Sequence, residues 1–222
     1  MIPPPYPRIP HLFAQPGADA DDRVMRPQQA TALLHSGSLL VEEKLDGFNV
    51  SIARDQYGWP QPYARSGKTH NDRGDQLGRI RAYLGQLAPA LEAVLSTWPV
   101  LYVEWLMREH SVHYDALPSW LVVLDLWSPT AGFAGAEERD RCCKPAGLFT
   151  PPRLYMGVVG DVAHLESLTL KSQFGSGPAE GAVMRDAIDQ TKPPLAKWLA
   201  PGFRRRSDEE LAGAGRNRLR DG

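Results

Sequence analysis

A lysine stands in the middle of an acidic and apolar segment, VEEKLDGFNVS, at residues 41–51. The segment is rich in strand-forming residues, and Gly47 permits a sharp backbone bend. A partly buried lysine loses hydration of its charged form, which lowers its pKa and makes the neutral amine available as a nucleophile. The carboxylates of Glu43 and Asp46 are able to hold a cation beside it. The segment therefore predicts a reactive Lys44, although a solvated lysine on a hairpin is the commoner interpretation for this residue alone.

Four more ionisable residues lie in or beside sequence runs that predict strands. They are Arg65 in 60–67, Glu104 in 100–106, Glu180 in 180–186 and Lys197 in 195–200. A carboxylate inside an apolar strand is costly unless it is paired or hydrogen-bonded. For either glutamate alone, the wet face of an edge strand is the commoner interpretation. Their occurrence in this order after Lys44 favours one shared site.

The elements that position these residues indicate an α+β fold with mostly antiparallel strands. Further strands are expected over 39–46, 48–55 and 119–127, since these short runs are bounded by turn residues. Apolar spacing predicts helices over 26–37, 75–98 and 161–174, with a break or kink at Pro89. The stretch 128–150 is expected to be irregular or partly helical. We expect a single domain over 1–222, with a Pro-rich extended segment over 1–25.

The amino-acid composition of the chain limits the kinds of partner that it is expected to bind. The net charge is −1, so binding of nucleic acid would need a local basic surface. No apolar run approaches the roughly 20 residues of a membrane span, so no membrane partner is expected. The two cysteines, Cys142 and Cys143, are adjacent and poorly placed to bridge each other, which predicts a reducing, cytoplasmic setting.

The tail over 204–222 is charged and rich in Gly and Ala, which predicts little fixed structure. It begins with three arginines, Arg204 to Arg206. Two interpretations of these arginines stay open, a solvated terminus or a phosphate-binding cluster.

The ordered set resembles the six-part signature of the covalent nucleotidyltransferases, which comprise polynucleotide ligases and mRNA capping enzymes. Its parts are K-x-D-G at 44–47, an Arg segment at 65–67, Glu104, an apolar strand at 121–127, E-G at 180–183 and Lys197. Within that superfamily the chain is most similar to the ATP-dependent RNA ligase family. Three features carry this similarity: Asn49, the HS-x-x-Y-x-x-LP element at 110–118 and the K-x-x-x-P-x-F ending at 197–203.

The resemblance implies a nucleotidyltransferase domain, the ATP-grasp-like adenylation domain of ligases, with antiparallel sheets flanked by helices. It implies an ATP-dependent RNA ligase that uses Mg²⁺ or Mn²⁺ and joins 5′-phosphate and 3′-hydroxyl RNA ends. A lysyl-AMP and an adenylylated RNA end are the implied intermediates.

The resemblance also assigns roles to residues. Lys44 is the nucleophile, and Lys197 neutralises the α-phosphate. Glu180 and Asp46 are the expected metal ligands. The expected nucleotide contacts are Glu43, Asn49, Arg65, Glu104, Leu124 and Lys197, with Glu104 on the ribose hydroxyls.

The sequence departs from the family pattern at three positions. Leu124 stands where an aromatic ring usually stacks on adenine, and Trp127 or Phe48 is a candidate to compensate. Leu199 replaces the second lysine of K-x-K, and Val103 replaces a common glycine. Two alternatives therefore stay open: a non-catalytic or adenylylation-only RNA-binding module, and a minimal DNA ligase.

The length after Lys197 suggests a bare catalytic domain. DNA ligases and capping enzymes usually append an OB-fold there, and the 25 residues that follow Lys197 leave no room for one. This expectation suggests a partner, such as an end-healing kinase or phosphatase.

Overall fold

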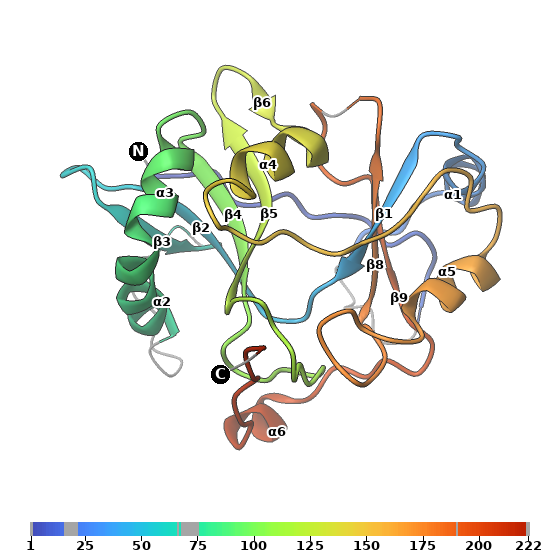
Figure 1. Ribbon diagram of the computed structural model, residues 1–222. Helices are drawn as coiled ribbons and strands as arrows, with labels where there is room; N and C mark the ends of the chain where they lie inside the picture. The colour runs from blue at the N-terminus through green and yellow to red at the C-terminus, as the bar shows by residue number, and fades with distance from the viewer. Residues whose placement is uncertain (1, 16–21, 66, 68–75, 190, 221–222) are drawn as a thin grey trace. The chain divides into compact units, whose positions relative to one another are not determined.

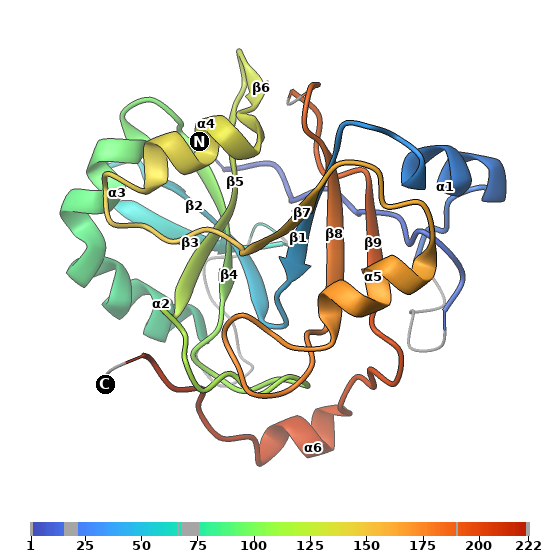
Figure 2. The ribbon, with the colours of Figure 1, turned by 45° about the vertical axis from the view of Figure 1, so that its right-hand side comes forward.

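The computed structural model describes residues 2–15, 22–65, 67, 76–189 and 191–220. These residues form two compact units, each built around one antiparallel sheet (Figures 1 and 2). The first unit comprises Met1–Pro7, Phe48–Trp105 and Leu121–Thr150, and the second comprises Arg8–Gly47, Leu106–Trp120 and Pro151–Gly222. No helix among the described residues is both long and apolar enough to cross a membrane.

The sheet of the first unit has the strand order β3-β2-β4-β5-β6. Its strands are β2 (Phe48–Arg54), β3 (Pro60–Ala64), β4 (Val100–Trp105), β5 (Leu121–Ser128) and β6 (Gly132–Phe133). Every residue of the central strand β4 is buried, as expected of a strand with neighbours on both edges. Glu104 therefore belongs to the interior of the sheet, and it is not on a wet edge strand.

The first unit contains the helices that apolar spacing predicts within 75–98, and it also contains a helix within 128–150, where irregular or partly helical structure was expected. They are α2 (Gln76–Leu84), the 3₁₀ turn η1 (Gly85–Leu87), α3 (Ala88–Leu95) and α4 (Gly135–Cys143). The expected break in the long helical pattern is confirmed, because α2 and α3 are separated by η1. Pro89 lies in the first turn of α3. Its ring would clash with the carbonyl of Gly85 in an unbroken helix, since that carbonyl lies four residues earlier.

The sheet of the second unit has the order β7-β1-β8-β9. Its strands are β1 (Leu39–Lys44), β7 (Arg153–Met156), β8 (Gly181–Asp186) and β9 (Ala196–Leu199). Helices α1 (Pro27–Leu34) and α5 (Val162–Thr169) pack on one face of this sheet, where their apolar side chains share a core with Val41, Met184 and Trp198. Figure 2 shows α5 beside β8 and β9.

Two elements of the second unit are absent from the sequence-based expectation. Strand β7 has only four residues, all at least partly exposed, and is too short to be recognised as a strand in the sequence. Helix α6 (Asp208–Ala212) lies in the charged tail and is capped by Ser207, whose hydroxyl accepts from the backbone N–H of Glu210. The described part of the tail, 204–220, has more fixed structure than its composition predicts, because buried Asn217 accepts a hydrogen bond from Tyr114 N–H and donates one to the Leu106 carbonyl.

Candidate active site

The predicted nucleophile and one predicted metal ligand are in direct contact in the second unit. Nζ of Lys44 donates a hydrogen bond of 2.7 Å to Oε2 of Glu180. Lys44 is the last residue of β1 and pairs with Gly181, so Glu180 stands directly before the residue opposite the lysine. The Lys44 side chain is 22% exposed and that of Glu180 is 2% exposed. The lysine is therefore partly buried, as its neighbourhood in the sequence predicts.

Burial dominates the electrostatics of Glu180. Burial, together with the nearby charge of Asp46, raises the pKa of this carboxyl from 4.5 to about 7. The positive charges of Lys44 and Arg205 act in the opposite direction. Glu180 therefore exchanges a proton near neutral pH, at hydrogen-bond distance from the Lys44 amine.

Asp46 anchors a loop of the same unit. Its Oδ2 atom accepts hydrogen bonds from the backbone N–H groups of Ser111 and Val112, at 2.6 and 2.8 Å. Its own N–H donates to the hydroxyl oxygen of Tyr114 at 2.8 Å, and Tyr114 is fully buried. The HS-x-x-Y element thus holds the bend that follows Lys44. Sequence reasoning singled out this element through the family resemblance and did not predict the contact between Tyr114 and Asp46.

Lys197 is held by residues that the sequence analysis did not select. Its Nζ donates to Oδ1 of Asp22 at 3.0 Å, and Oδ2 of Asp22 lies 2.8 Å from Nε2 of the buried His11. Burial lowers the pKa of His11, and the charges of Lys197 and Lys44 lower it further, whereas Asp22 opposes this shift. Residues 10–12 also run along β9, because Leu12 N–H donates to the Lys197 carbonyl and Lys197 N–H to the Pro10 carbonyl.

Glu43 does not join the Lys44 cluster. Successive side chains of a strand point to opposite faces, so Glu43 shares the helix-covered face with Val41. Its carboxylate accepts hydrogen bonds from the Ser172 hydroxyl at 2.5 Å and from Gln173 N–H at 2.8 Å. Burial raises the pKa of this carboxyl. The structure thus gives Glu43 partners within the second unit on the face away from Lys44.

The first unit brings two predicted nucleotide contacts together. Asn49 on β2 lies directly opposite Glu104 on β4. Its amide Nδ2 donates to Oε2 of Glu104 at 3.2 Å. Glu104 is 8% exposed, and the amide orients its carboxylate. Arg65, by contrast, is exposed and donates to the Tyr6 carbonyl at 3.1 Å.

Leu124 occupies an irregular position in β5. Val103 pairs with Val123 and Tyr102 pairs with Asp125, so Leu124 is the extra residue of a β-bulge. The carbonyl of Leu124 accepts a hydrogen bond of 2.9 Å from Nη1 of Arg139, whose side chain is fully buried. A bulge re-aims a side chain, and Leu124 is half-buried. Sequence reasoning missed Arg139, which lies in a run of charges typical of a solvated helix.

The carboxylates suit a divalent cation that is shared with phosphate. In the described part of the chain, no three His, Cys, Asp or Glu residues are grouped as a complete metal cage. Mg²⁺ in phosphate-transfer sites is usually bound by one or two carboxylates together with substrate phosphates and water. The buried Glu180 carboxylate fits that arrangement, because its pKa is raised even beside Lys44 and a bound cation would favour its ionised form.

The sequence of residues 37–199 matches the model of the family described as RNA ligase. This range contains Lys44, Asn49, Arg65, Glu104, Leu124, Glu180 and Lys197. No curated protein matches the chain in sequence.

Solved structures of ligases share the fold. An archaeal ATP-dependent RNA ligase superposes with a TM-score of 0.61 at 20% identity, covering 88% of this chain and 48% of the ligase. A Naegleria gruberi RNA ligase mutant with ATP and Mn gives 0.62 at 13% identity, covering 91% and 61%. A putative ATP-dependent DNA ligase from Aquifex aeolicus gives 0.53 at 17% identity, covering 88% and 50%.

The structural matches confirm the predicted α+β fold with antiparallel sheets. The chain spans about half of the length of the archaeal ligase that it resembles.

Proposed function

The chain belongs to the RNA ligase family, and on that premise we propose that it is an ATP-dependent RNA ligase that joins 5′-phosphate and 3′-hydroxyl ends of broken RNA. One observation carries the proposal: the Lys44 amine and the Glu180 carboxylate are 2.7 Å apart, where the end of β1 pairs with the start of β8. A lysine in such a place can act as a nucleophile, because a proton acceptor is already at hydrogen-bond distance.

Lys44 performs the first step. Its Nζ, as the neutral amine, attacks the α-phosphorus of ATP. A P–N bond forms, and the bond to the bridging oxygen breaks as pyrophosphate leaves. Glu180 accepts the proton that Nζ gives up, since a carboxyl with a pKa of about 7 is poised for proton exchange near neutral pH.

Two transfers to RNA complete the reaction. A 5′-phosphate oxygen of RNA attacks the phosphorus of lysyl-AMP, the P–N bond breaks, and Lys44 regains its proton. The oxygen of the 3′-hydroxyl then attacks the phosphorus of the adenylylated 5′-phosphate and gives up its proton. A phosphodiester bond forms, and the bond between that phosphorus and AMP breaks as AMP leaves. Both transfers develop charge on phosphate oxygens, and in this proposal Lys197 offsets that charge.

The remaining residues bind the nucleotide. Glu104, oriented by Asn49, accepts hydrogen bonds from the ribose hydroxyls. Arg65 contributes a guanidinium for the ribose or phosphate, and Leu124 gives the adenine an apolar contact in place of a stacked ring. Glu180 and Asp46 would hold Mg²⁺ or Mn²⁺ together with the phosphates, and such an ion offsets charge on the phosphate oxygens.

Label transfer from ATP tests the proposal. The protein is incubated with α-labelled ATP and Mg²⁺ or Mn²⁺, and is then run on a denaturing gel. Acid-labile label should appear on the wild-type chain and on Lys192→Ala, a variant of an exposed lysine paired with Asp189. Label should be absent from Lys44→Ala. Wild-type protein that stays unlabelled with either metal, and with ATP or GTP, contradicts the proposal and favours a non-catalytic RNA-binding module.

Sealing assays separate the remaining alternatives. Leu124 and Leu199 favour an adenylylation-only module, which would label Lys44 but would not seal nicked RNA alone. Preferential sealing of nicked DNA would identify a minimal DNA ligase. An end-healing kinase or phosphatase is the partner we propose, and normal sealing by the chain alone would remove the need for it. Both cysteines are free, which suits the cytoplasmic location that we propose.

A further inference from the structure

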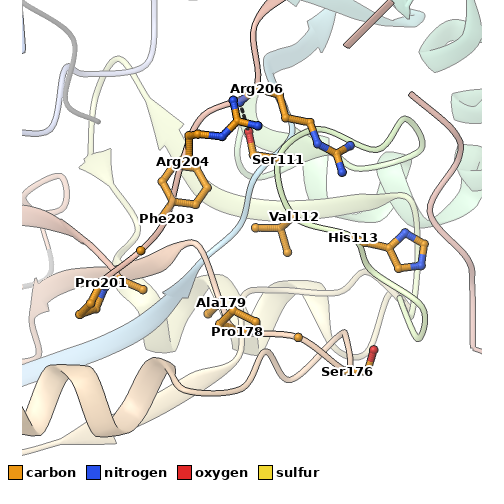
Figure 3. A pocket seen from close by; sticks show the side chains of 13 residues that line it. Ser111, Val112, His113, Ser176, Pro178, Ala179, Pro201, Phe203, Arg204 and Arg206 are labelled. Atoms are coloured by element: carbon orange, nitrogen blue, oxygen red, sulfur yellow. Dashed lines mark hydrogen bonds between the residues drawn. The ribbon is translucent and has the colours of Figure 1, made fainter. Parts of the chain in front are cut away.

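A cavity of about 420 Å³ lies within the second unit (Figure 3). Pockets of this size are typical of small-molecule sites. Figure 3 shows the segment from Pro201 to Arg206 along one side and Ser176 to Ala179 along another. We propose that this pocket binds the 5′-phosphate end of the RNA strand, with the phosphate on the arginine side and the terminal base on Phe203. The proposal rests on the function proposed above, from which RNA comes as the ligand.

The walls of the pocket are joined to the catalytic cluster. Ser111 and Val112 line it, and their backbone N–H groups are the ones that hold Asp46. Ala179, another lining residue, directly precedes Glu180. Ala200 also lines the pocket, and its N–H donates to the Glu180 carbonyl at 2.9 Å. The walls of the cavity are therefore joined to Asp46 and Glu180 by hydrogen bonds and by the chain itself.

The lining residues indicate a nucleotide. Three of them carry or can acquire positive charge: Arg204, Arg206 and His113. Ser111 and Ser176 supply hydroxyl groups, and Phe203 supplies an aromatic ring. Guanidinium groups recognise phosphate through charge-assisted hydrogen bonds. An aromatic ring adds a platform for an unpaired base, which is how single-stranded RNA ends are usually bound.

The arginines can exchange their present partners for phosphate. Arg204 pairs with Glu210 at 2.7 Å, but its side chain is 70% exposed. Exposed ion pairs contribute little net free energy, so a doubly charged terminal phosphate competes well for this guanidinium. Arg206 is fixed more firmly, because its N–H donates to the Ser111 hydroxyl and its Nη1 donates to Glu109 and to the His110 carbonyl. Among the described residues, the side-chain hydrogen bonds of Arg206 leave from Nη1, and a guanidinium has five N–H donors.

A terminal 5′-phosphate suits the pocket better than an internal phosphodiester. A monoester carries up to two negative charges near neutral pH, whereas a diester carries one, so a cluster of cations favours the end. The second step of the proposed reaction also requires this phosphate beside lysyl-AMP. The pocket adjoins the Lys44 cluster through the contacts described above.

Binding measured without ATP tests the inference. Fluorescence anisotropy is recorded for a labelled single-stranded RNA that carries either a 5′-phosphate or a 5′-hydroxyl. The full chain should prefer the 5′-phosphate form. Arg204→Ala should weaken that form by about tenfold, the effect of one charge-assisted contact, and should leave the 5′-hydroxyl form nearly unchanged. Phe203→Ala should weaken both forms.

Arg141→Ala is the matched control. Arg141 is 72% exposed and pairs with Glu138 at 2.6 Å, as Arg204 pairs with Glu210. This variant should bind RNA like the wild type. Equal binding of the two RNA forms by the wild type, or equal loss of both in Arg204→Ala, overturns the 5′-end assignment.

A second readout separates this inference from the proposed function. Label transfer from ATP to Lys44 should be unchanged in Arg204→Ala and Phe203→Ala. A loss of labelling would assign the pocket to ATP and would overturn the inference. If the wild-type chain is never labelled but still prefers 5′-phosphate RNA, the proposed reaction is contradicted and the assignment of the pocket is supported.

Discussion

The ammonium of Lys197 lies 3.0 Å from the carboxylate of Asp22, although the two residues are 175 positions apart in the chain. Asp22 is also bound to buried His11, so the lysine is part of a three-residue chain of hydrogen bonds. A lysine has a long and flexible side chain, and a fixed acceptor limits where its charge is placed. Asp22 is therefore a positioning residue for Lys197.

Replacement of Asp22 by alanine should slow the labelling of Lys44. With saturating ATP, the rate should fall by about ten- to a hundredfold, because small misplacements of a charged group are costly in catalysis. The KM for ATP should not rise, because Asp22 competes with phosphate for Lys197. Rapid-quench measurement of label transfer gives both constants. The control is Asp189→Ala, which removes the partner of exposed Lys192. A wild-type rate in Asp22→Ala would show that Lys197 needs no such support.

Gly181 admits no side chain. A Cβ atom at this position would lie 1.9 Å from the carbonyl oxygen of Trp198 on the neighbouring strand β9. This oxygen belongs to the backbone of β9, so β8 and β9 would have to separate. Gly181→Ala should therefore lower the free energy of unfolding by about 3 kcal/mol, at the upper end of overpacking effects. Gly213→Ala is the control, since Gly213 has a φ of −94° and open space around it. Urea unfolding that shows the same small change for both variants would contradict this prediction.

Glu180 should make stability depend on pH. Its pKa is about 7 in the folded chain, compared with an ordinary value of 4.5. Between these values the folded state binds more protons than the unfolded state, so the free energy of unfolding falls as pH rises from about 4.5 to about 7. The contribution of Glu180 to this fall is about 1–3 kcal/mol, and Glu180→Gln should remove it. Chemical denaturation across this range is the measurement, with exposed Glu209→Gln as control. Parallel pH profiles for wild type and Glu180→Gln would contradict the assignment.

Short-range patterns predicted much of the fold. Strands β1, β2 and β3 and the interrupted helix α2–α3 follow from local apolar spacing and turn residues. The pairing of β1 with β8 brings Lys44 beside Glu180, and the resemblance placed both in one site without showing their contact. Successive side chains of a strand point to opposite faces, so Glu43 and Lys44 are expected on opposite faces of β1 from the sequence alone. The prediction that both belong to one site did not take this alternation into account.

The contacts between residues far apart in the chain could not be predicted from the sequence. Asp22 lies in a segment without periodicity, and nothing in its neighbourhood indicates that it reaches Lys197. Asn217 lies in a charged tail, yet it is buried because it bonds to backbone groups of residues 106 and 114. Such partners depend on how distant segments fold together, and a single sequence carries no direct signal of that.

Arg139 and Arg141 show this limit within one helix. Both lie in EERDRCC of α4, and both have an acidic neighbour as ion-pair partner. Arg139 is fully buried and donates to the Leu124 carbonyl at the bulge of β5, whereas the Arg141 side chain is 72% exposed. The pattern of charges in the sequence does not distinguish the two arginines. Their difference in burial arises from the sheet on which α4 packs.

Leucine at each of these two positions should therefore have very different effects. Arg139→Leu removes a fully buried guanidinium and takes away the donor of the Leu124 carbonyl, which costs about 1–3 kcal/mol. Arg141→Leu removes an exposed pair and should change the free energy of unfolding little. Urea unfolding at neutral pH measures both. Arg139→Leu protein that stays folded should also bind ATP more weakly, since its bulge no longer holds Leu124. Equal destabilisation by the two substitutions would show that the guanidinium of Arg139 does not support the bulge.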